Sequence, residues 1–460
     1  MRGTLAQLIA SMPGSQMTAD ASFDKVSTDS RTANAGALFV ALRGETFDAH
    51  DFLPQVAANG AAAVVAERLP EDWTLPAIVV PNTLSALGQI ANGWRRQYAI
   101  PVIGVTGSNG KTTVKEMIAA ILAAAFGEQA RLATQGNLNN EIGVPLTLMR
   151  LEAAHRAAVV ELGMNHPGEI ARLAAIAQPT VAMVNNAQRE HQEFMHTVEA
   201  VAQENGSVFA ALPADGVAVY PGDDTYTALW QGLASHCRSL TFGLNDACDV
   251  HALYVSSGFG NNLKVTVPGG AFDLTLAAAG EHNVRNALAA IACALAAGIE
   301  HDVIVRGLEA FAPVGGRLQR KQAANGALVI DDTYNANPDS MRAAIDVLAS
   351  YPAPRILVVG DMGEVGTQGR EFHEEIGAYA HSRGIETVLA TGELSRHVVT
   401  HGGSQQHEHF EQFEDVLAAL DKALGGNSDA TVLVKGSRFM KMERVVAHLI
   451  GSTHTGKDAH

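Results

Sequence analysis

The segment IPVIGVTGSNGKTTVKEMIAAILAAAF, residues 100–126, determines the architecture in the middle of this chain. A short apolar run, VIGV, leads through the glycine-bearing turn TGSNG into a stretch whose apolar residues recur at helical spacing. Strand, glycine loop and helix in this order are typical of a phosphate-binding unit. The segment therefore predicts an α/β unit in which a helix N-terminus faces a phosphate group.

The turn itself contains the groups of a nucleoside triphosphate site. Glycines let successive N–H groups face phosphate oxygens, a lysine bridges the outer phosphates, and a threonine hydroxyl is a ligand for Mg²⁺. Five residues rather than four separate Gly104 from Gly110, so the plain GxxxxGK[ST] pattern fails, but the GKTT ending favours phosphate binding over a simple connection. The predicted cofactor-binding residues here are Gly107, Ser108, Asn109, Gly110, Lys111, Thr112 and Thr113, of which Lys111 is also predicted to be catalytic.

Two further apolar runs follow this unit, AAVVEL at 157–162 and TVAMVN at 180–185, separated by a helical pattern. Alternating strands and helices predict a mainly parallel sheet, whose strands end at one common edge. Phosphoryl transfer requires Mg²⁺ at such an edge. Glu161 lies at the end of the first run and His191 just beyond the second, and we predict that both are catalytic and bind the metal together with Thr112. We interpret Glu190 and Glu193 as a solvated loop face.

Composition excludes several other classes of protein. At about 150 residues per domain, 460 residues predict about three domains. The formal charge of −16 argues against general nucleic-acid binding but leaves room for a local phosphate site. The N-terminal stretch lacks a secretory apolar region, and the longest apolar stretch, at 287–298, is too short to cross a bilayer. We therefore expect a cytoplasmic protein without membrane insertion.

The pattern of apolar runs predicts three α/β domains, at residues 1–97, 98–312 and 313–460. In the middle one, β-type segments between 250 and 276 indicate an antiparallel flap beside the parallel sheet. From ALVIDD at 327–332 onward, strands and helices alternate again, which is typical of a doubly wound, Rossmann-like domain.

Seven ordered motifs resemble those of a known family, the Mur ligases, which build the peptide stem of bacterial peptidoglycan. The motifs are VSTDSRTANAGALFVALRGETFDAHDF (26–52), GVTGSNGKTTVKEM (104–117), TQGNLNNEIGVPLTL (134–148), GEHNVRNALAA (280–290), VIDDTYNANPDSM (329–341), GDMGEVG (360–366) and VKGSR (434–438). Three of them, NLNNEIGVP, DDTYNANP and VKGSR, are similar to the branch of the family that adds D-alanyl-D-alanine. The DNPR signature of the diaminopimelate-adding branch is absent.

The resemblance implies a small N-terminal domain for a UDP-linked substrate, a central ATPase of the P-loop type and a C-terminal Rossmann-like domain that closes over the site. It implies an ATP- and Mg²⁺-dependent ligase that joins D-alanyl-D-alanine to UDP-N-acetylmuramoyl-tripeptide through an acyl phosphate. We expect a monomer with these two substrates as its partners and no nucleic acid.

The resemblance also implies roles for individual residues. For the UDP-sugar these are Thr28, Asp29, Ser30, Arg31, Arg43, Gly44 and His50. For the muramoyl part they are Thr134, Asn137 and Asn140, and for the nucleotide Asn283, Arg317, Asp332 and Tyr334. For the incoming dipeptide, whose carboxylate needs a cation or amide donors, they are Asn335, Asn337, Lys435 and Arg438. Without the resemblance, we would interpret the charged residues of this set as ordinary charges in loops and at strand ends.

One position departs from the family pattern. Many members carry a lysine, thought to be carbamylated, where this chain has Asn205. An amide cannot be carbamylated, so a second metal ion would be held more weakly or by a neighbour such as Glu204. Two alternatives remain: a ligase of the same family that adds diaminopimelate or lysine, and a nucleotide-binding partner protein without ligase activity.

Overall fold

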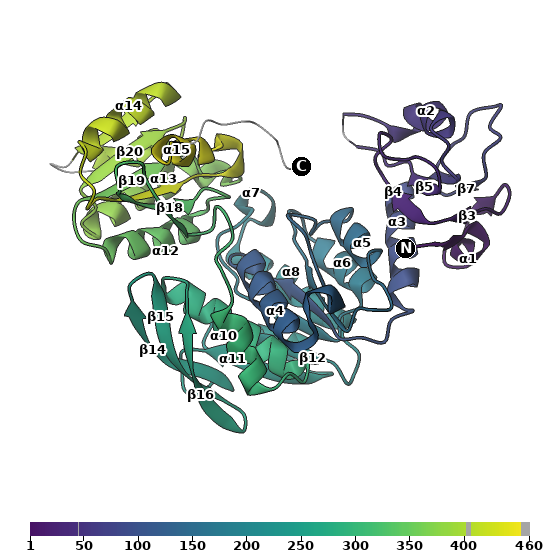
Figure 1. Cartoon of the computed structure of the whole chain (residues 1–460), viewed down its shortest axis with the longest axis horizontal. Helices are drawn as coiled ribbons and strands as arrows, with labels where there is room; N and C mark the ends of the chain where they lie inside the picture. Colours follow the sequence, from purple (N-terminus) through teal and green to yellow (C-terminus); the bar gives the residue numbers. More distant parts are fainter. Residues whose placement is uncertain (45, 402–405, 452–460) are drawn as a thin grey trace.

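The chain forms three α/β units in a row, each built on its own sheet (Figure 1). The computed structural model describes residues 1–44, 46–401 and 406–451. The unit nearest the N-terminus lies on the right of Figure 1, the central unit in the middle and the C-terminal unit at the upper left. Three α/β units with a mainly parallel central sheet confirm the predicted fold class.

The N-terminal unit has a five-stranded sheet. In sheet order its strands are β2 (Gln16–Met17), β7 (Ala77–Val79), β6 (Ala63–Ala66), β5 (Ala37–Val40) and β4 (Lys25–Ser27), while β1 (Gly3–Thr4) pairs with β3 (Ser22–Phe23). Its helices are α1 (Leu5–Ile9), α2 (Leu53–Ala58) and α3 (Thr83–Arg95). Every residue of β5 and β6 is buried, as expected for parallel strands covered on both faces.

Helix α3 joins this unit to the next through a shared core. It packs against α5 (Gly143–Leu148) and α6 (Glu169–Ala177) of the central unit. The Arg95 guanidinium is buried at the junction and donates hydrogen bonds of 3.1 Å to the carbonyls of Ala177 and Gln178. One continuous cluster of buried apolar side chains runs through both units.

The central unit has a nine-stranded sheet. In sheet order the strands are β16 (Gly270–Leu276), β15 (Gly260–Val267), β14 (Val250–Ser257), β13 (Arg238–Gly243), β12 (Val217–Pro221), β11 (Val181–Val184), β8 (Val102–Thr106), β10 (Ala157–Glu161) and β9 (Arg131–Ala133). Its further helices are α4 (Lys111–Phe126), α7 (Gln192–Met195), α8 (Val198–Gly206), α9 (Thr227–Leu233), α10 (Glu281–Ala296) and α11 (His301–Glu309). Pairing is parallel from β9 to β14, so the carboxyl ends of β10, β8 and β11 meet at one edge.

Strands β14, β15 and β16 pair antiparallel, which confirms the predicted flap. The flap extends below the C-terminal unit in Figure 1. At its first turn, the Phe259 ring lies 6.5 Å from the ring of Tyr351, centroid to centroid, and packs against the core of the C-terminal unit.

The C-terminal unit is doubly wound, as predicted. In sheet order its strands are β17 (Gln319–Gln322), β18 (Leu328–Asp332), β22 (Thr431–Lys435), β19 (Arg355–Val359), β20 (Thr387–Thr391) and β21 (Gln406–Phe410), and its helices are α12 (Pro338–Ala349), α13 (Gly369–Ser382), α14 (Phe413–Leu424) and α15 (Glu443–Leu449). Separate apolar cores form on the two faces of the sheet. Strands β17 and β21, which consist largely of polar residues, were not among the predicted elements.

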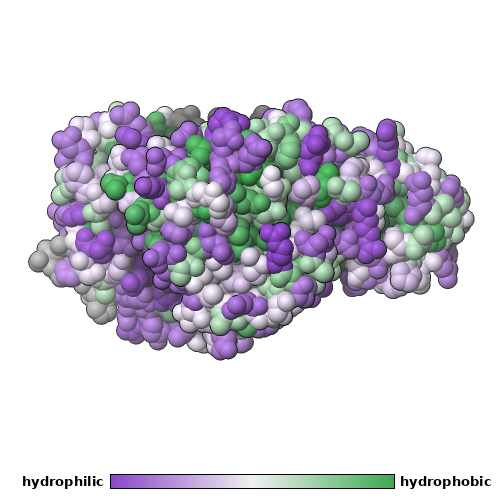
Figure 2. All heavy atoms as spheres, turned by 90° about the horizontal axis from the view of Figure 1, so that it is seen from below, coloured by the Kyte–Doolittle hydropathy of each residue, from purple (hydrophilic) through white to green (hydrophobic). Residues whose placement is uncertain are grey.

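Polar side chains are spread across the face of the molecule seen in Figure 2, between smaller apolar areas. Within the ranges that the structure describes, no helix is both long and apolar enough to span a bilayer.

Candidate active site

The glycine loop lies at the carboxyl end of β8, as the sequence predicts. Strand β8 ends at Thr106, and α4 begins at Lys111. Gly107 and Gly110 have φ angles of 129° and 80°, which side chains other than glycine rarely adopt. A Cβ on Gly110 would lie 2.4 Å from Oδ1 of Asn286. Glycine is therefore required at both ends of the turn for the backbone to take this course.

Asparagine side chains hold the loop in place. The Asn109 amide N–H donates to Oδ1 of Asn186 at 2.9 Å, and its carbonyl accepts from Nδ2 of Asn185 at 2.7 Å. At the start of the loop, Oδ1 of the fully buried Asn205 accepts from the Thr106 hydroxyl at 2.7 Å and from the Gly107 N–H at 3.1 Å. The loop is thus shaped by the protein itself before any phosphate arrives.

Asn205, at the position where the family resemblance implies a lysine, therefore has a structural task in this chain. Its neighbour Glu204 is not free to replace a metal ligand, because its carboxylate accepts hydrogen bonds from the Gly168 and Ile170 N–H groups at 2.8 and 2.9 Å. These bonds cap the first turn of α6. The structure gives no support to Glu204 as a substitute ligand.

The Lys111 ammonium is already occupied. It donates to the carbonyls of Gly107 at 2.5 Å and Ser108 at 3.0 Å, and lies 3.3 Å from Oε2 of Glu190. Glu190 is 6% exposed, and its Oε1 has no hydrogen-bond partner among the described residues. Our interpretation of Glu190 as solvated was wrong, because the segment after β11 folds back over the loop; Glu193 is exposed, as expected.

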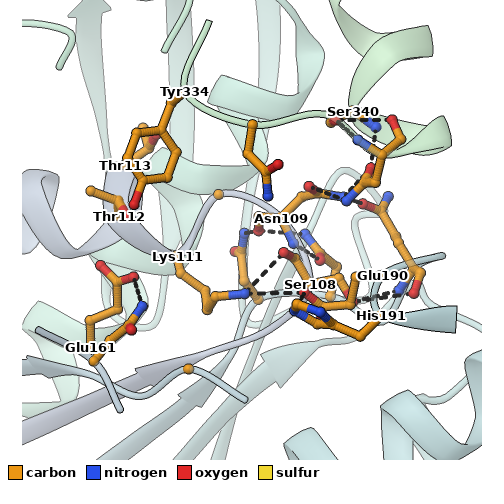
Figure 3. A pocket seen from close by; sticks show the side chains of 18 of the residues that line it. Ser108, Asn109, Lys111, Thr112, Thr113, Glu161, Glu190, His191, Tyr334 and Ser340 are labelled. Carbon is orange, nitrogen blue, oxygen red and sulfur yellow. Dashed lines mark hydrogen bonds and ion pairs between the residues drawn. The ribbon is translucent and has the colours of Figure 1, made fainter. Parts of the chain in front are cut away.

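The predicted metal ligands do not all converge. Glu161 is 2% exposed; its Oε1 accepts from Nδ2 of Asn139 at 2.8 Å, and its Oε2 has no partner within the described part of the chain. His191 faces the C-terminal unit, with Nδ1 2.5 Å from Oε2 of Glu364, and this close contact with the imidazole is the main cause that lowers the pKa of Glu364. Figure 3 shows Glu161 and His191 on opposite sides of Lys111.

In the described ranges, no three His, Cys, Asp or Glu side chains form a ready metal cluster. The buried free oxygen of Glu161 nevertheless fits a hard cation, since Mg²⁺ prefers carboxylate and hydroxyl oxygens. Thr112, in the first turn of α4, lines the same cavity. The role of each residue as a ligand stays a prediction.

A cavity of about 1190 Å³ opens between the central and C-terminal units (Figure 3). Many predicted site residues line it. They are Ser108, Asn109, Gly110, Lys111, Thr112, Thr113, Asn137, Asn140, Glu161, His191, Asn283, Arg317, Asp332, Tyr334, Asn335, Asn337, Lys435 and Arg438. Thr134 lies just behind it, where its hydroxyl accepts from the Glu161 N–H at 3.0 Å.

The C-terminal unit supplies a mixed polar wall to this cavity. The Arg317 guanidinium lies 4.2 Å from the centroid of the Tyr334 ring, a cation–π contact that presents a flat surface. Lys435 is 3% exposed, and its ammonium lies 2.6 Å from Oδ2 of Asp332 and donates to the Asn335 carbonyl at 2.8 Å. The charge of Lys435 is thus already paired with a carboxylate, unlike the free cation we expected for the dipeptide.

Arg438 and Asn337 lie at two helix starts of the same wall. Arg438 is exposed and pairs with Glu443 at 2.8 Å. Asn337 caps α12, and its Nδ2 donates to Oδ1 of Asn109 at 2.9 Å, across the gap between units. Beside Asn283, burial lowers the pKa of the His282 imidazole.

The residues predicted for the UDP-sugar lie apart from this cavity. Thr28, Asp29, Ser30 and Arg31 follow β4, while Arg43, Gly44 and His50 follow β5, so both groups lie at the carboxyl edge of one parallel pair. The hydrogen bond from Arg31 lowers the pKa of Asp29. The His50 ring is buried, lies 2.5 Å from Oδ1 of Asp48 and accepts from the Glu67 N–H, which are structural contacts. From this unit, Leu84 of α3 lines the cavity.

Comparison with protein families gives three matches along the chain. Residues 22–95 match the model described as Mur ligase family, catalytic domain; residues 105–294 match the Mur ligase middle domain; and residues 316–438 match the Mur ligase, glutamate ligase domain. Together they cover most of the chain.

Individual relatives match over almost the full length. The UDP-N-acetylmuramoyl-tripeptide–D-alanyl-D-alanine ligase of Escherichia coli is 41% identical over 449 residues, 97% of this chain and 98% of the relative. The ligase of the same name from Bacillus subtilis is 35% identical, with 93% of each chain covered. A crystal structure of MurF from Acinetobacter baumannii is 36% identical, with a TM-score of 0.92 and 98% and 99% of the two chains covered.

A second solved structure, MurF ligase from Thermotoga maritima in complex with ADP, is 27% identical with a TM-score of 0.84, covering 93% of this chain and 97% of that one. Three family models, close relatives and this fold agree with the motifs found in the sequence. The chain belongs to the Mur ligase family.

Proposed function

We propose that the chain is an ATP-dependent ligase that joins D-alanyl-D-alanine to UDP-N-acetylmuramoyl-tripeptide, for peptidoglycan precursor synthesis in the cytoplasm. The Escherichia coli and Bacillus subtilis relatives that carry this activity in their names match 97% and 93% of the chain. The observation that carries the chemistry is the phosphate loop, where Lys111 and the free oxygen of Glu161 face one cavity.

ATP would bind with its phosphates at residues 107–113 and its base and ribose near Asn283, Arg317, Asp332 and Tyr334. The flat Arg317 and Tyr334 pair suits an aromatic base, and the backbone N–H groups of the loop suit phosphate oxygens. On binding, the Lys111 ammonium would exchange the Glu190 carboxylate for a phosphate oxygen.

Mg²⁺ would be held by Thr112 and Glu161, with His191 as a further proposed ligand. When bound, the ion neutralises charge on the phosphates during transfer. Glu161 is suited to this task because its carboxylate is buried and is held in one orientation by Asn139.

The reaction would proceed in two steps. The C-terminal carboxylate of the tripeptide attacks the γ-phosphorus of ATP, so that an acyl phosphate forms and ADP leaves. The amine of D-alanyl-D-alanine then attacks the acyl carbon, loses a proton, and phosphate leaves. Lys111 would stabilise the charge that develops in the first step, and the C-terminal unit would exclude water that would otherwise hydrolyse the acyl phosphate.

The substrates would bind on either side of this site. We assign the UDP-sugar to Thr28, Asp29, Ser30, Arg31, Arg43, Gly44 and His50, the muramoyl part to Thr134, Asn137 and Asn140, and the dipeptide to Asn335, Asn337, Lys435 and Arg438. Among the dipeptide residues, exposed Arg438 is better placed for a carboxylate than Lys435, which is paired with Asp332. The proposed domains are residues 1–97, 98–312 and 313–460, acting as a monomer.

The test is phosphate release by the purified protein with Mg²⁺ATP, UDP-N-acetylmuramoyl-tripeptide and D-alanyl-D-alanine. We expect release above controls that lack one substrate, and its loss in Lys111→Ala. Replacing the dipeptide by diaminopimelate or lysine separates the two other ligase activities. The proposal is abandoned if the complete mixture releases no more phosphate than the controls.

A further inference from the structure

The segment that follows β11, residues 186–191, contacts two different units of the molecule. Its even-numbered side chains face the phosphate loop. Oδ1 of Asn186 accepts from the Asn109 N–H at 2.9 Å, Oε1 of Gln188 accepts from Nδ2 of Asn109 at 2.6 Å, and Glu190 lies 3.3 Å from the Lys111 ammonium. This side of the segment is therefore bonded to the residues that would hold phosphate.

Two other side chains of the segment, those of Arg189 and His191, face the C-terminal unit. The Arg189 guanidinium lies 2.7 Å from Oδ1 of Asp339 on α12 and 2.6 Å from Oε2 of Glu375 on α13. The Arg189 backbone N–H also donates to Asp339, at 2.8 Å, and the guanidinium lies 5.3 Å from the centroid of the Phe372 ring. His191 contacts Glu364 at 2.5 Å.

The backbone turns between these side chains, because the Glu190 N–H donates to the Gln188 carbonyl at 2.9 Å around Arg189 and His191 has a φ angle of 47°. The consequence is mechanical. A shift of this short segment that moves Gln188 and Glu190 relative to the loop also moves Arg189 relative to the C-terminal unit. Binding of an anion at Lys111 would act on the loop side of the segment, since it competes with Glu190 for the ammonium.

The Arg189 contacts are strong for a surface between units. Guanidinium and carboxylate groups form charge-assisted bonds, and Arg189 makes bidentate contacts with both carboxylates. The side chains of Arg189 and Asp339 are each 23% exposed, so water screens the pair less than an open surface pair. Opening the gap between the units breaks all of these bonds together.

We propose that residues 186–191 couple the phosphate loop to the closed position of the C-terminal unit, with Arg189 as the latch that holds this unit closed. Arg189 is then a positioning residue: the latch keeps Arg317 and Tyr334 at the nucleotide cavity. By reciprocity, whatever favours closure also favours nucleotide binding. The coupling rests on the proposed nucleotide site, whereas the latch itself does not.

The test compares Arg189→Gln with Arg342→Gln in the full-length protein. Arg342 donates to the same Glu375 at 3.1 Å, but both residues belong to the C-terminal unit, so its loss removes no contact between units. Small-angle X-ray scattering gives the radius of gyration, titration with a fluorescent ADP analogue gives nucleotide affinity, and thermal melting confirms folding.

We expect Arg189→Gln to raise the radius of gyration and to weaken ADP binding about tenfold, which equals about 1.4 kcal/mol. We expect Arg342→Gln to keep the wild-type radius of gyration and an ADP affinity within twofold of wild type. Asp339→Asn removes the partner of Arg189 and should change both readouts in the same direction. In the double variant with Arg189→Gln, the loss of ADP binding free energy should be smaller than the sum of the two single losses.

The latch is refuted if Arg189→Gln and Asp339→Asn fold and keep the wild-type radius of gyration, and the coupling is refuted if they also keep wild-type ADP affinity. Neither readout requires turnover. If the variants behave as expected but the wild-type protein releases no phosphate, the latch is supported and only the proposed ligase activity is overturned.

Discussion

Replacing Asn205 with alanine tests whether this amide shapes the phosphate loop. The change removes the acceptor of two buried donors, the Thr106 hydroxyl and the Gly107 N–H. Leaving a buried donor unpaired costs about 1–3 kcal/mol, so we expect the central unit to lose about 3 kcal/mol of stability. At about 2–4 °C per kcal/mol for a unit of this size, its melting temperature should fall by about 6–12 °C.

The loop effect is measured separately, by ADP titration. Because Gly107 begins the loop, we expect ADP affinity to fall about tenfold, or about 1.4 kcal/mol. Asn261→Ala is the matched control, since Asn261 is also fully buried and bonds the Ala278 carbonyl and the Ser256 hydroxyl in the flap. It should lower the melting temperature without weakening ADP binding. The reasoning fails if Asn205→Ala melts within about 2 °C of wild type, or if both variants lose affinity equally.

Three further substitutions or conditions address the site and the latch. Glu190→Gln removes the carboxylate beside Lys111, so ADP should bind several-fold more tightly in EDTA. Unchanged or weaker binding in fluorescence titration would contradict competition between Glu190 and phosphate for Lys111. Gly110→Ala places a Cβ 2.4 Å from a buried amide oxygen at a φ angle of 80°, so ADP affinity should fall at least about tenfold. The control is Gly60→Ala, at an exposed glycine that also has a positive φ angle but open space around it, and it should leave ADP affinity unchanged. The hydrogen bond from Arg189 lowers the pKa of Glu375, so this pair stabilises the closed position fully above the ordinary glutamate pKa and loses its effect as the pH falls through the lowered pKa. X-ray scattering should therefore show a larger radius of gyration in acid. A radius of gyration that stays constant down to the lowered pKa would contradict this.

The sequence predicted those features that depend on local pattern. The phosphate loop could be found because glycine, lysine and threonine spacing reflects backbone geometry that few other residues allow. The flap could be found because β-type residues alternate with glycine turns. Strand β21, QHEHF, was missed because its residues are polar: it is an edge strand whose pairing with β20 is a matter of tertiary context.

Contacts between residues far apart in the chain were beyond what a single sequence can give. Glu190 is a charged loop residue in the sequence, and its burial follows from the segment after β11 folding back over the phosphate loop, where it lies 3.3 Å from Lys111. Lys435 is predicted for the dipeptide carboxylate, but the pairing of β18 with β22 brings Asp332, about a hundred residues earlier in the chain, beside it. His191 turns toward Glu364 for a similar reason. Partners at such separations leave no periodic signal.

The core that α3 shares with α5 and α6 bears on how enzymes of this architecture change specificity. A recombination event near residue 97 would separate Arg95 from the carbonyls that it binds at the end of α6 and would expose apolar side chains on both fragments. A chimera that imports a foreign N-terminal unit must therefore also inherit matching surfaces on α5 and α6. Point substitution in the loops after β4 and β5, where we propose that the UDP-sugar binds, leaves that core intact and would be the easier evolutionary route to a new sugar ligand.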